Sequence, residues 1–262
     1  MTVDFYRSLW GPMGFDGDIS TLAAVCADTV ARGYAGVETN PLLWRDKAEE
    51  GRRIVEDHGL AFLARAHTFG GSVADHVGWV RRCVELAAQF ASPHVIVQSG
   101  ADWFDDAQVD EYFGATAQIE ADSGLRLAHE THRGCILYSP WVTARALDRW
   151  PDIWLASDYS HFVMVAERYL ETEAALLARF ALRVVHIDAR VGTPESPQVA
   201  DPRADPVAVA AFDRFWDEIH QAGNLLTVVP EFGAAPYAPV DSGNLDDICQ
   251  WMADHLRARW SA

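Results

Sequence analysis

Short apolar runs alternate with segments of helical periodicity along the whole chain. Between the runs, apolar residues recur every three or four positions, as at Ile19, Leu22, Cys26 and Val30. An alternation of strand and helix signals predicts parallel strands joined by helices. The eight runs that we interpret as strands begin near Val3, Ala35, Ala61, His94, Leu125, Ile153, Leu182 and Leu225.

Eight strand–helix units in 262 residues are typical of one closed α/β barrel, a (β/α)8 TIM barrel that spans residues 1–262. A doubly wound sheet is the alternative. It often carries a G-x-G-x-x-G turn after the first strand, which Gly11 and Gly14 do not form. The longest connection covers residues 191–206 after the seventh strand and holds four prolines. This segment either covers a substrate or is a solvated insertion.

The charge balance excludes several partners and cofactors. The chain has 38 acidic residues against 21 Lys and Arg, a net charge of −17, and Lys47 is its one lysine. Proteins that bind nucleic acid need clustered basic residues, so we expect no nucleic acid partner and disfavour an apurinic endonuclease. No lysine lies at a strand end to form a Schiff base, and no phosphate-binding G-x-x-x-x-G-K motif is present. We therefore expect no nucleotide cofactor.

Cysteine spacing and hydropathy bear on the compartment. The four cysteines are far apart and form no C-x-x-C motif, which favours core thiols in a reducing environment. No apolar run approaches the roughly 20 residues of a membrane helix, so we expect no membrane partner. The first residues lack a basic segment followed by an apolar one, so we expect no signal peptide and a cytoplasmic location.

Acidic and histidine side chains gather at the ends of four consecutive predicted strands. These are Glu130, Asp158, His186 and Glu231. The carboxyl ends of barrel strands meet at one rim, where three carboxylates repel one another unless a cation compensates them. Hard oxygen ligands with one nitrogen favour Mn²⁺, Mg²⁺ or Co²⁺. Each residue alone also has a structural explanation as a helix N-cap, an ion-pair partner or a core histidine, so the prediction of a metal site depends on all four together.

These residues resemble the pattern of the xylose-isomerase-like TIM barrels, a family of sugar phosphate isomerases and epimerases. The matching segments are Glu130, Asp158-Tyr159-Ser160-His161, His186, Glu231 and the earlier Gly33-Tyr34-Ala35-Gly36-Val37-Glu38. The resemblance covers essentially the whole chain and is specific for the fold and the metal site, but weak for the substrate. It implies a divalent metal, Mn²⁺ first, on Glu130, Asp158, His186 and Glu231. It also implies that Glu130 and Glu231 are the catalytic acid/base pair and that His161 contacts the substrate.

Further residues are candidates for substrate binding. In the epimerases an arginine follows the histidine of the seventh strand, and here Arg190 follows His186 at a different spacing. His67, His132, Trp10 and Trp103 also follow or end predicted strands, although backbone hydrogen bonds, ion pairs or helix packing would explain each of them. Basic residues at the predicted rim are few. We therefore expect a neutral sugar, keto-sugar or polyol as the substrate.

The predicted chemistry is isomerisation or epimerisation by proton transfer. A metal would polarise the carbonyl and stabilise an enediolate, while one glutamate removes the α-proton and a proton is returned elsewhere. A lyase of the same family, a dehydratase or keto-sugar deglycosidase, is the alternative. A non-catalytic barrel subunit is a remote alternative, and the family resemblance also allows a homo-oligomer.

Overall fold

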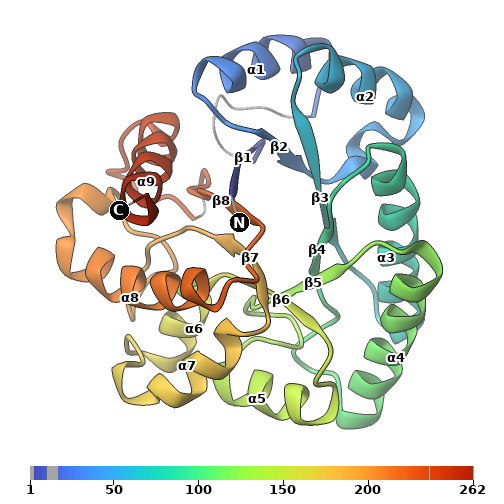
Figure 1. Cartoon of the computed structure of the whole chain (residues 1–262). Coiled ribbons are helices and arrows are strands. Elements are labelled where there is room, and N and C mark those ends of the chain that lie inside the picture. Colours follow the sequence, from blue (N-terminus) through green and yellow to red (C-terminus); the bar gives the residue numbers. More distant parts are fainter. Residues whose placement is uncertain (1–2, 11–16, 236, 262) are drawn as a thin grey trace.

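The computed structural model describes residues 3–10, 17–235 and 237–261. Gly11 and Gly14 lie outside these ranges. Within them, parallel strands hydrogen-bond in the order β1 to β8, and β8 pairs with β1 to close the barrel (Figure 1). The predicted (β/α)8 barrel is confirmed, and each predicted apolar run contains one strand. The strands are β1 Asp4–Ser8, β2 Gly36–Thr39, β3 Ala61–His67, β4 Val95–Gln98, β5 Leu127–Glu130, β6 Trp154–Ser157, β7 Val184–Asp188 and β8 Thr227–Val229.

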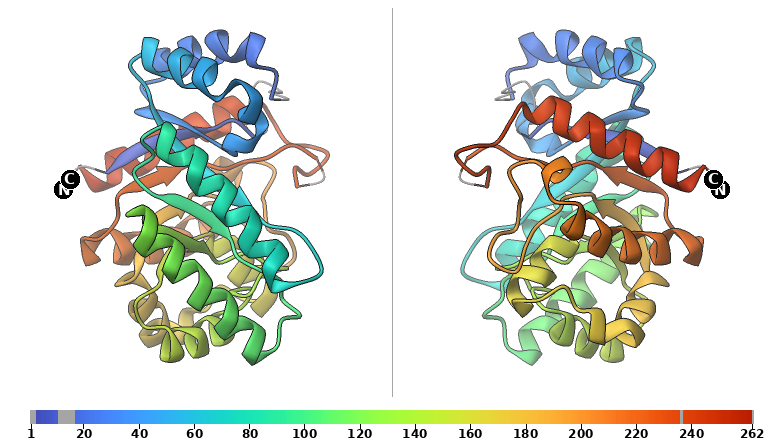
Figure 2. Two further views of the ribbon diagram at one scale, coloured as in Figure 1. Left: turned by 90° about the vertical axis from the view of Figure 1, so that its right-hand side faces the viewer. Right: turned by 90° about the vertical axis from the view of Figure 1, so that its left-hand side faces the viewer.

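Helices cover the outside of the barrel, and the connection between β8 and α9 projects beyond one end of it (Figure 2). Within the described residues, no helix is long and apolar enough to cross a membrane. The α-helices are α1 Ile19–Ala31, α2 Ala48–Asp57, α3 Val73–Gln89, α4 Asp106–Ser123, α5 Pro140–Arg149, α6 Tyr159–Ala166, α7 Ala174–Ala181, α8 Pro206–Ala222 and α9 Leu245–Trp260. Short 3-10 helices are η2 Pro41–Lys47, η3 Glu171–Glu173 and η4 Pro202–Ala204.

Local sequence explains where the helices begin and end. Ser72 and Asp75 form a capping box at the start of α3, because each side chain accepts a hydrogen bond from the other residue's backbone. Helices α4 and α8 end at Gly124 and Gly223, whose φ values of 69° and 79° are left-handed. Glycine adopts this conformation at little cost, so a glycine at these positions fixes the point where each helix turns into the next strand.

The barrel interior changes character from one end to the other. Alternate residues of a strand point to the same face, so Leu63, Arg65 and His67 of β3 share the inward side. An apolar inner layer consists of Tyr6, Leu63, Ile96, Ala128, Ala156, Val185 and Val229. Charged residues follow one step nearer the carboxyl ends. A register shift between β6 and β7 pairs Leu155 with Val184 but Ala156 with His186, which brings Asp188 into the charged layer.

The segment 191–206 packs onto the barrel. Gln198 is buried, and its side chain exchanges two hydrogen bonds with the backbone of Gly233, at 2.9 and 3.2 Å. The middle of the segment is therefore packed on the barrel, and the segment as a whole is not a solvated insertion. Whether the segment covers a substrate stays a prediction. All four cysteines are free and buried, which agrees with the predicted core thiols.

Candidate active site

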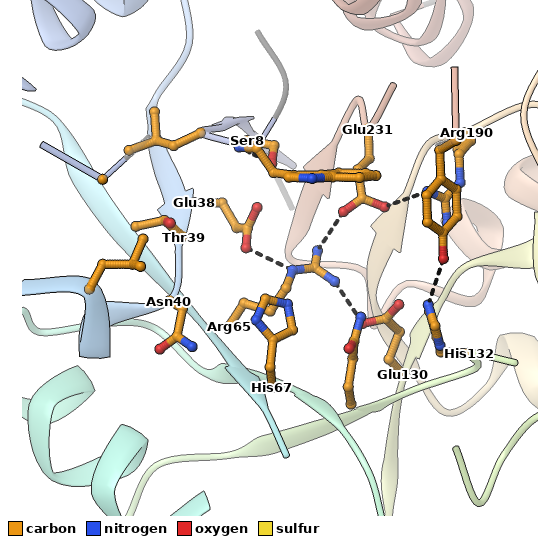
Figure 3. A pocket seen from close by; sticks show the side chains of 16 residues that line it. Ser8, Glu38, Thr39, Asn40, Arg65, His67, Glu130, His132, Arg190 and Glu231 are labelled. Atoms are coloured by element: carbon orange, nitrogen blue, oxygen red, sulfur yellow. Dashed lines mark hydrogen bonds and ion pairs between the residues drawn. The ribbon is translucent and has the colours of Figure 1, made fainter. Parts of the chain in front are cut away.

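A cavity of about 410 Å³ opens at the carboxyl ends of the strands (Figure 3). Its lining includes the last residues of β1 to β5, namely Ser8, Thr39, His67, Gln98 and Glu130. Glu231, which follows β8, also lines the cavity. Parallel strands therefore deliver side chains from distant parts of the sequence to one end of the barrel, where a small ligand can be enclosed.

Arg65 lies at the centre of this end of the barrel. Its Nε donates to Glu38 and a terminal nitrogen donates to Glu130, both at 2.7 Å (Figure 3). A terminal nitrogen also donates to Asp188 at 2.5 Å. Only 4% of the Arg65 side chain is exposed. A buried guanidinium is stable where acidic groups compensate it, and here three carboxylates from three other strands do so.

Arg190 is a second buried cation. It pairs with Asp158, donates to the Ser160 hydroxyl at 3.2 Å, and lies 3.4 Å from Oε2 of Glu231. The Tyr237 ring packs on its guanidinium at 5.0 Å. Asp158 is also the N-cap of α6, since its Oδ1 accepts from the backbone and hydroxyl of Ser160 at 3.1 and 2.6 Å. Asp158 therefore orients Arg190 from behind the cavity wall.

Burial shifts the pKa values of two of the glutamates that line the cavity, Glu130 and Glu231. Burial raises the pKa of Glu231 to about 8, with a further rise from Asp188 that Arg65 opposes. Burial also raises the pKa of Glu130 well above its ordinary value, although the positive charge of Arg65 opposes this rise. Burial opposes ionisation of Asp188 too, but Arg65 and His186 lower the pKa of that carboxyl overall. Two carboxyls that can hold protons thus lie beside one that stays ionised.

Burial favours the neutral form of three histidines at or behind the cavity wall, His67, His132 and His161. Burial, assisted by Arg65, lowers the pKa of His67 to about 4, and burial with Arg190 lowers the pKa of His132 to about 3. Burial also lowers the pKa of His161, which contacts Arg190 at 3.0 Å. Glu130, His132 and His161 place one ligand atom each within 4.8 Å of one another, close enough to hold a metal ion.

His186 lies deeper than the other three predicted ligands. It is fully buried, and its Nδ1 pairs with the Thr227 hydroxyl at 2.7 Å while its Nε2 pairs with Asp188 at 3.0 Å. Both ring nitrogens are therefore engaged. Glu130 bonds to Arg65 and Asp158 to Arg190. Arg65 and Arg190 thus occupy oxygens of Glu130 and Asp158 that a divalent ion would use, and His186 has no free ring nitrogen. Whether the four predicted residues bind a metal stays a prediction.

Of the residues predicted from the sequence, six line the cavity: Glu130, Glu231, Arg190, His67, His132 and Trp10. Asp158, His161 and His186 are fully buried behind them. Trp103 is not among the lining residues; it is 56% exposed and packs against Phe104 at 4.8 Å. Trp10 stands edge-on to Tyr237 at 5.3 Å and forms part of the wall. Their catalytic, metal-binding and substrate-binding roles stay predictions.

Sequence reasoning missed Arg65, Asp188 and Tyr237. Arg65 had a visible signal, because it shares its strand face with Leu63 and His67 in an otherwise apolar run. Asp188 had the same kind of signal, two residues after His186. The sequence near Tyr237 has no periodicity that would place it, since the residue comes from the irregular connection after β8.

A barrel with acidic and basic side chains converging at the carboxyl ends of its strands is typical of TIM-barrel enzymes. The family described as xylose isomerase-like TIM barrel matches residues 26–226. The chain therefore belongs to this family, as the sequence resemblance indicates, and shares its enzyme-like architecture. The sequence has no significant match among curated proteins.

Solved structures share the fold at low identity. D-allulose 3-epimerase from Methylomonas sp. has a TM-score of 0.71 at 15% identity, covering 98% of both chains. A xylose isomerase-like TIM barrel protein from Mycobacterium smegmatis in complex with magnesium has a TM-score of 0.66 at 13% identity, covering 97% of this chain and 98% of that one. Endonuclease IV from Thermus thermophilus reaches 0.61 at 15% identity, covering 97% of both. One fold thus carries different reactions, so the reaction must be argued from the site.

Proposed function

We propose that this protein is an isomerase or epimerase of a small sugar or polyol-derived carbonyl compound. The observation that carries the proposal is the presence of Glu130 and Glu231 at the carboxyl ends of two separate strands, at one cavity beside two guanidinium groups. Moving a proton between carbon atoms, or between the two faces of one carbon, requires a base and an acid. It also requires positive charge near the oxygen that becomes negative.

The proposed mechanism assigns proton transfer to the two glutamates. In its ionised form, Glu231 removes the proton next to the substrate carbonyl, and its pKa of about 8 suits a base that must also release the proton. The N–H groups of Arg65 and Arg190 face the same space and stabilise the negative oxygen of the resulting enediolate. Glu130, whose pKa is raised by burial, returns a proton to the other face or to the adjacent carbon.

The size and charge of the cavity support a small, neutral substrate. A volume of about 410 Å³ accommodates a monosaccharide-sized molecule. Five buried carboxyl groups surround two guanidinium groups, so a further anion is disfavoured; they are Glu38, Glu130, Asp158, Asp188 and Glu231. Trp10 offers an apolar wall to the C–H face of a sugar, and polar groups such as Asn40 and Gln98 can pair with its hydroxyls.

Dependence on a divalent metal, with Mn²⁺ expected first and Mg²⁺ or Co²⁺ next, stays a prediction from the sequence. Among the described residues, Glu130, His132 and His161 form a group that could bind such an ion. The proton transfers above use the chain's own carboxyls and guanidinium groups. Removal of metal with a chelator tests the prediction directly.

A lyase that expels a β-hydroxyl or glycosyl group is the second candidate. The raised pKa of Glu231 favours it, because a protonated carboxyl can donate to a leaving oxygen. The two activities differ in their products. Incorporation of solvent deuterium into a recovered isomer supports an isomerase, whereas release of water or an alcohol with an unsaturated product supports a lyase.

The proposed function is tested with a panel of ketoses, aldoses and keto-polyols in D₂O, followed by NMR. From the wild type we expect a product isomer and exchange at a carbon next to the carbonyl. Glu231→Gln should lose both, and Glu130→Gln should lose the product isomer. Glu85→Gln is the matched control, because this exposed glutamate lies on α3 away from the cavity. Exchange that persists in both cavity variants would contradict the assigned acid/base pair. Location in the cytoplasm, assembly into a homo-oligomer and the absence of a nucleic acid partner complete the proposal.

A further inference from the structure

We propose that Arg65 supplies the positive charge that we expected from a divalent metal, so that this site binds its substrate and works without a metal ion. The inference rests on the proposed function for its catalytic part only. Its structural part concerns which cation compensates the acidic cluster, and a binding measurement can test that part without any substrate.

Arg65 contacts acidic residues of several strands. A guanidinium has five N–H donors in a fixed plane. Four hydrogen bonds from Arg65 reach Glu38, Glu130 and both oxygens of Asp188. Three carboxylates from β2, β5 and β7 thus surround one cation, which is the arrangement that a metal would otherwise create.

Three of the four expected metal ligands are paired with neighbouring side chains. Glu130 accepts from Arg65 at 2.7 Å, and Asp158 pairs with Arg190. Both nitrogens of His186 pair with neighbouring side chains. A metal ion on these residues would have to displace two buried guanidinium groups and leave them near the ion. Like charges repel strongly in a buried site, so guanidinium and metal compete for the same carboxylates.

Two histidines near Glu130 could form a smaller metal site with it. His161 Nε2 lies 3.0 Å from a nitrogen of Arg190, and His132 Nε2 lies 3.4 Å from the Tyr237 hydroxyl. The remaining acid of that group, Glu130, is the one already bonded to Arg65. Arg65 and Arg190 therefore also compete with a cation at Glu130, His132 and His161.

The same guanidinium groups are within reach of a substrate. Arg65 and Arg190 both line the cavity. One Arg65 nitrogen approaches Glu231 at 3.7 Å, and Arg190 approaches the other oxygen of Glu231 at 3.4 Å. A substrate oxygen that enters beside Glu231 would meet N–H donors of both residues. Two fixed guanidinium groups can thus polarise a carbonyl and hold an enediolate, as preorganised donors do in other enzymes.

The experiment compares Mn²⁺ binding by the wild type, Arg65→Met and Arg7→Met. Each protein is dialysed against EDTA and then titrated with MnCl₂ by calorimetry, and its melting temperature is measured with and without Mn²⁺. Arg7 is the matched control, because it is also buried and pairs with two acids, Asp28 and Asp246, but does not line the cavity. We expect no stoichiometric binding of Mn²⁺ by the wild type or by Arg7→Met. Addition of Mn²⁺ should leave the melting temperature of each protein unchanged.

Arg65→Met should acquire Mn²⁺, because it leaves Glu38, Glu130 and Asp188 without their common cation. Mn²⁺ should raise its melting temperature, since a ligand that binds only the folded state stabilises it. Stoichiometric Mn²⁺ on the wild type, or a folded Arg65→Met that binds none, would overturn the proposal. If Arg65→Met does not fold, the wild type and the charge-preserving Arg65→Lys decide, and both should remain free of Mn²⁺.

These outcomes are separate from those of the proposed function. Absence of turnover on every carbonyl sugar would refute the isomerase proposal and leave the Mn²⁺ titrations valid. Conversely, stoichiometric Mn²⁺ on the wild type would refute the role of Arg65 while leaving Glu130 and Glu231 as the proton-transfer pair.

Discussion

Oε1 of Glu231 lies 3.7 Å from a nitrogen of Arg65, beyond hydrogen-bond distance. The same guanidinium donates to Glu130 at 2.7 Å. Of the two glutamates in the proposed acid/base pair, Glu231 is therefore the less tightly held and the better placed to reach a substrate proton. Arg190, at 3.4 Å on its other side, keeps the carboxyl aimed at the cavity.

Glu231→Gln should lower kcat by about 10²- to 10⁴-fold, the usual contribution of a general base. Its amide keeps the size of the side chain and can still contact a substrate hydroxyl, so KM should change little. Steady-state kinetics on the substrate found in the exchange panel provide the measurement. A large rise in KM with an unchanged kcat would instead assign Glu231 to binding alone.

The stability of the fold should fall as the pH rises from about 6.5 to about 8. Below 6.5 the buried histidines, whose pKa values burial lowers, act in the opposite direction. Burial raises the pKa of Glu231 from 4.5 to about 8 in the folded protein, so unfolding between these values releases a proton. A higher pH then favours the unfolded chain, with a slope of at most about 1.4 kcal/mol per pH unit from this group. Glu130 contributes in the same direction, because burial raises its pKa as well. Urea unfolding across this range measures the slope.

The variant Glu231→Gln isolates the contribution of Glu231 to the pH dependence of stability. Glu231→Gln removes the titrating group, so its free energy of unfolding should fall less steeply with pH than that of the wild type. Glu85→Gln should leave the slope unchanged, because this glutamate is exposed. Equal slopes for the wild type and Glu231→Gln would mean that Glu231 is ionised in the folded protein at neutral pH.

Gly233→Ala should weaken substrate binding through Trp10. A Cβ atom at Gly233 would lie 1.9 Å from the Trp10 ring, so the ring must leave its place in the cavity wall. We expect KM to rise about tenfold, the equivalent of about 1.4 kcal/mol of lost aromatic contact. Trp10→Ala should show a similar rise, and the double variant should add little to either.

Gly71→Ala is the control for this prediction, since a Cβ at Gly71 meets no heavy atom within 4 Å. Its KM should equal that of the wild type. A Gly233→Ala enzyme with normal KM would show that Trp10 does not contact the substrate.

Gln198→Ala should loosen the segment 191–206. It removes both side-chain hydrogen bonds to the Gly233 backbone and leaves two buried polar groups without those partners, at a cost of about 1 to 3 kcal/mol. Trypsin should then cleave faster at Arg203, within the segment. Mass spectrometry of a limited digest locates the cut, and Gln89→Ala, at an exposed position of α3, is the control. If the segment covers the substrate, KM rises as well.

The barrel could be predicted from the sequence because its signals are local. Apolar runs fix the strands, and glycines such as Gly124 and Gly223 mark the ends of helices. The positions of Glu130 and Glu231 followed from the same reasoning, since the ends of parallel strands must meet. The need for positive charge among the carboxylates was also visible in the sequence.

The source of that charge could not be predicted in the same way. Arg65 is stable in the barrel only because acids from three other strands reach it, and such contacts are not local. The depth of His186 relative to Asp188 depends on the register shift between β6 and β7, which strand periodicity does not reveal. Sequence reasoning therefore located the candidate site at the carboxyl ends of the strands, but it did not predict which of its residues lie deeper in the barrel.

Because Arg65 is part of the polypeptide, its positive charge is present in every molecule of the protein. The ion pairs of Arg65 form as the barrel closes, in fixed proportion to each chain synthesised, and need no loading step afterwards. Under the proposed role of Arg65, the protein would keep its activity when transition metals are scarce and would resist poisoning by foreign ions such as cadmium.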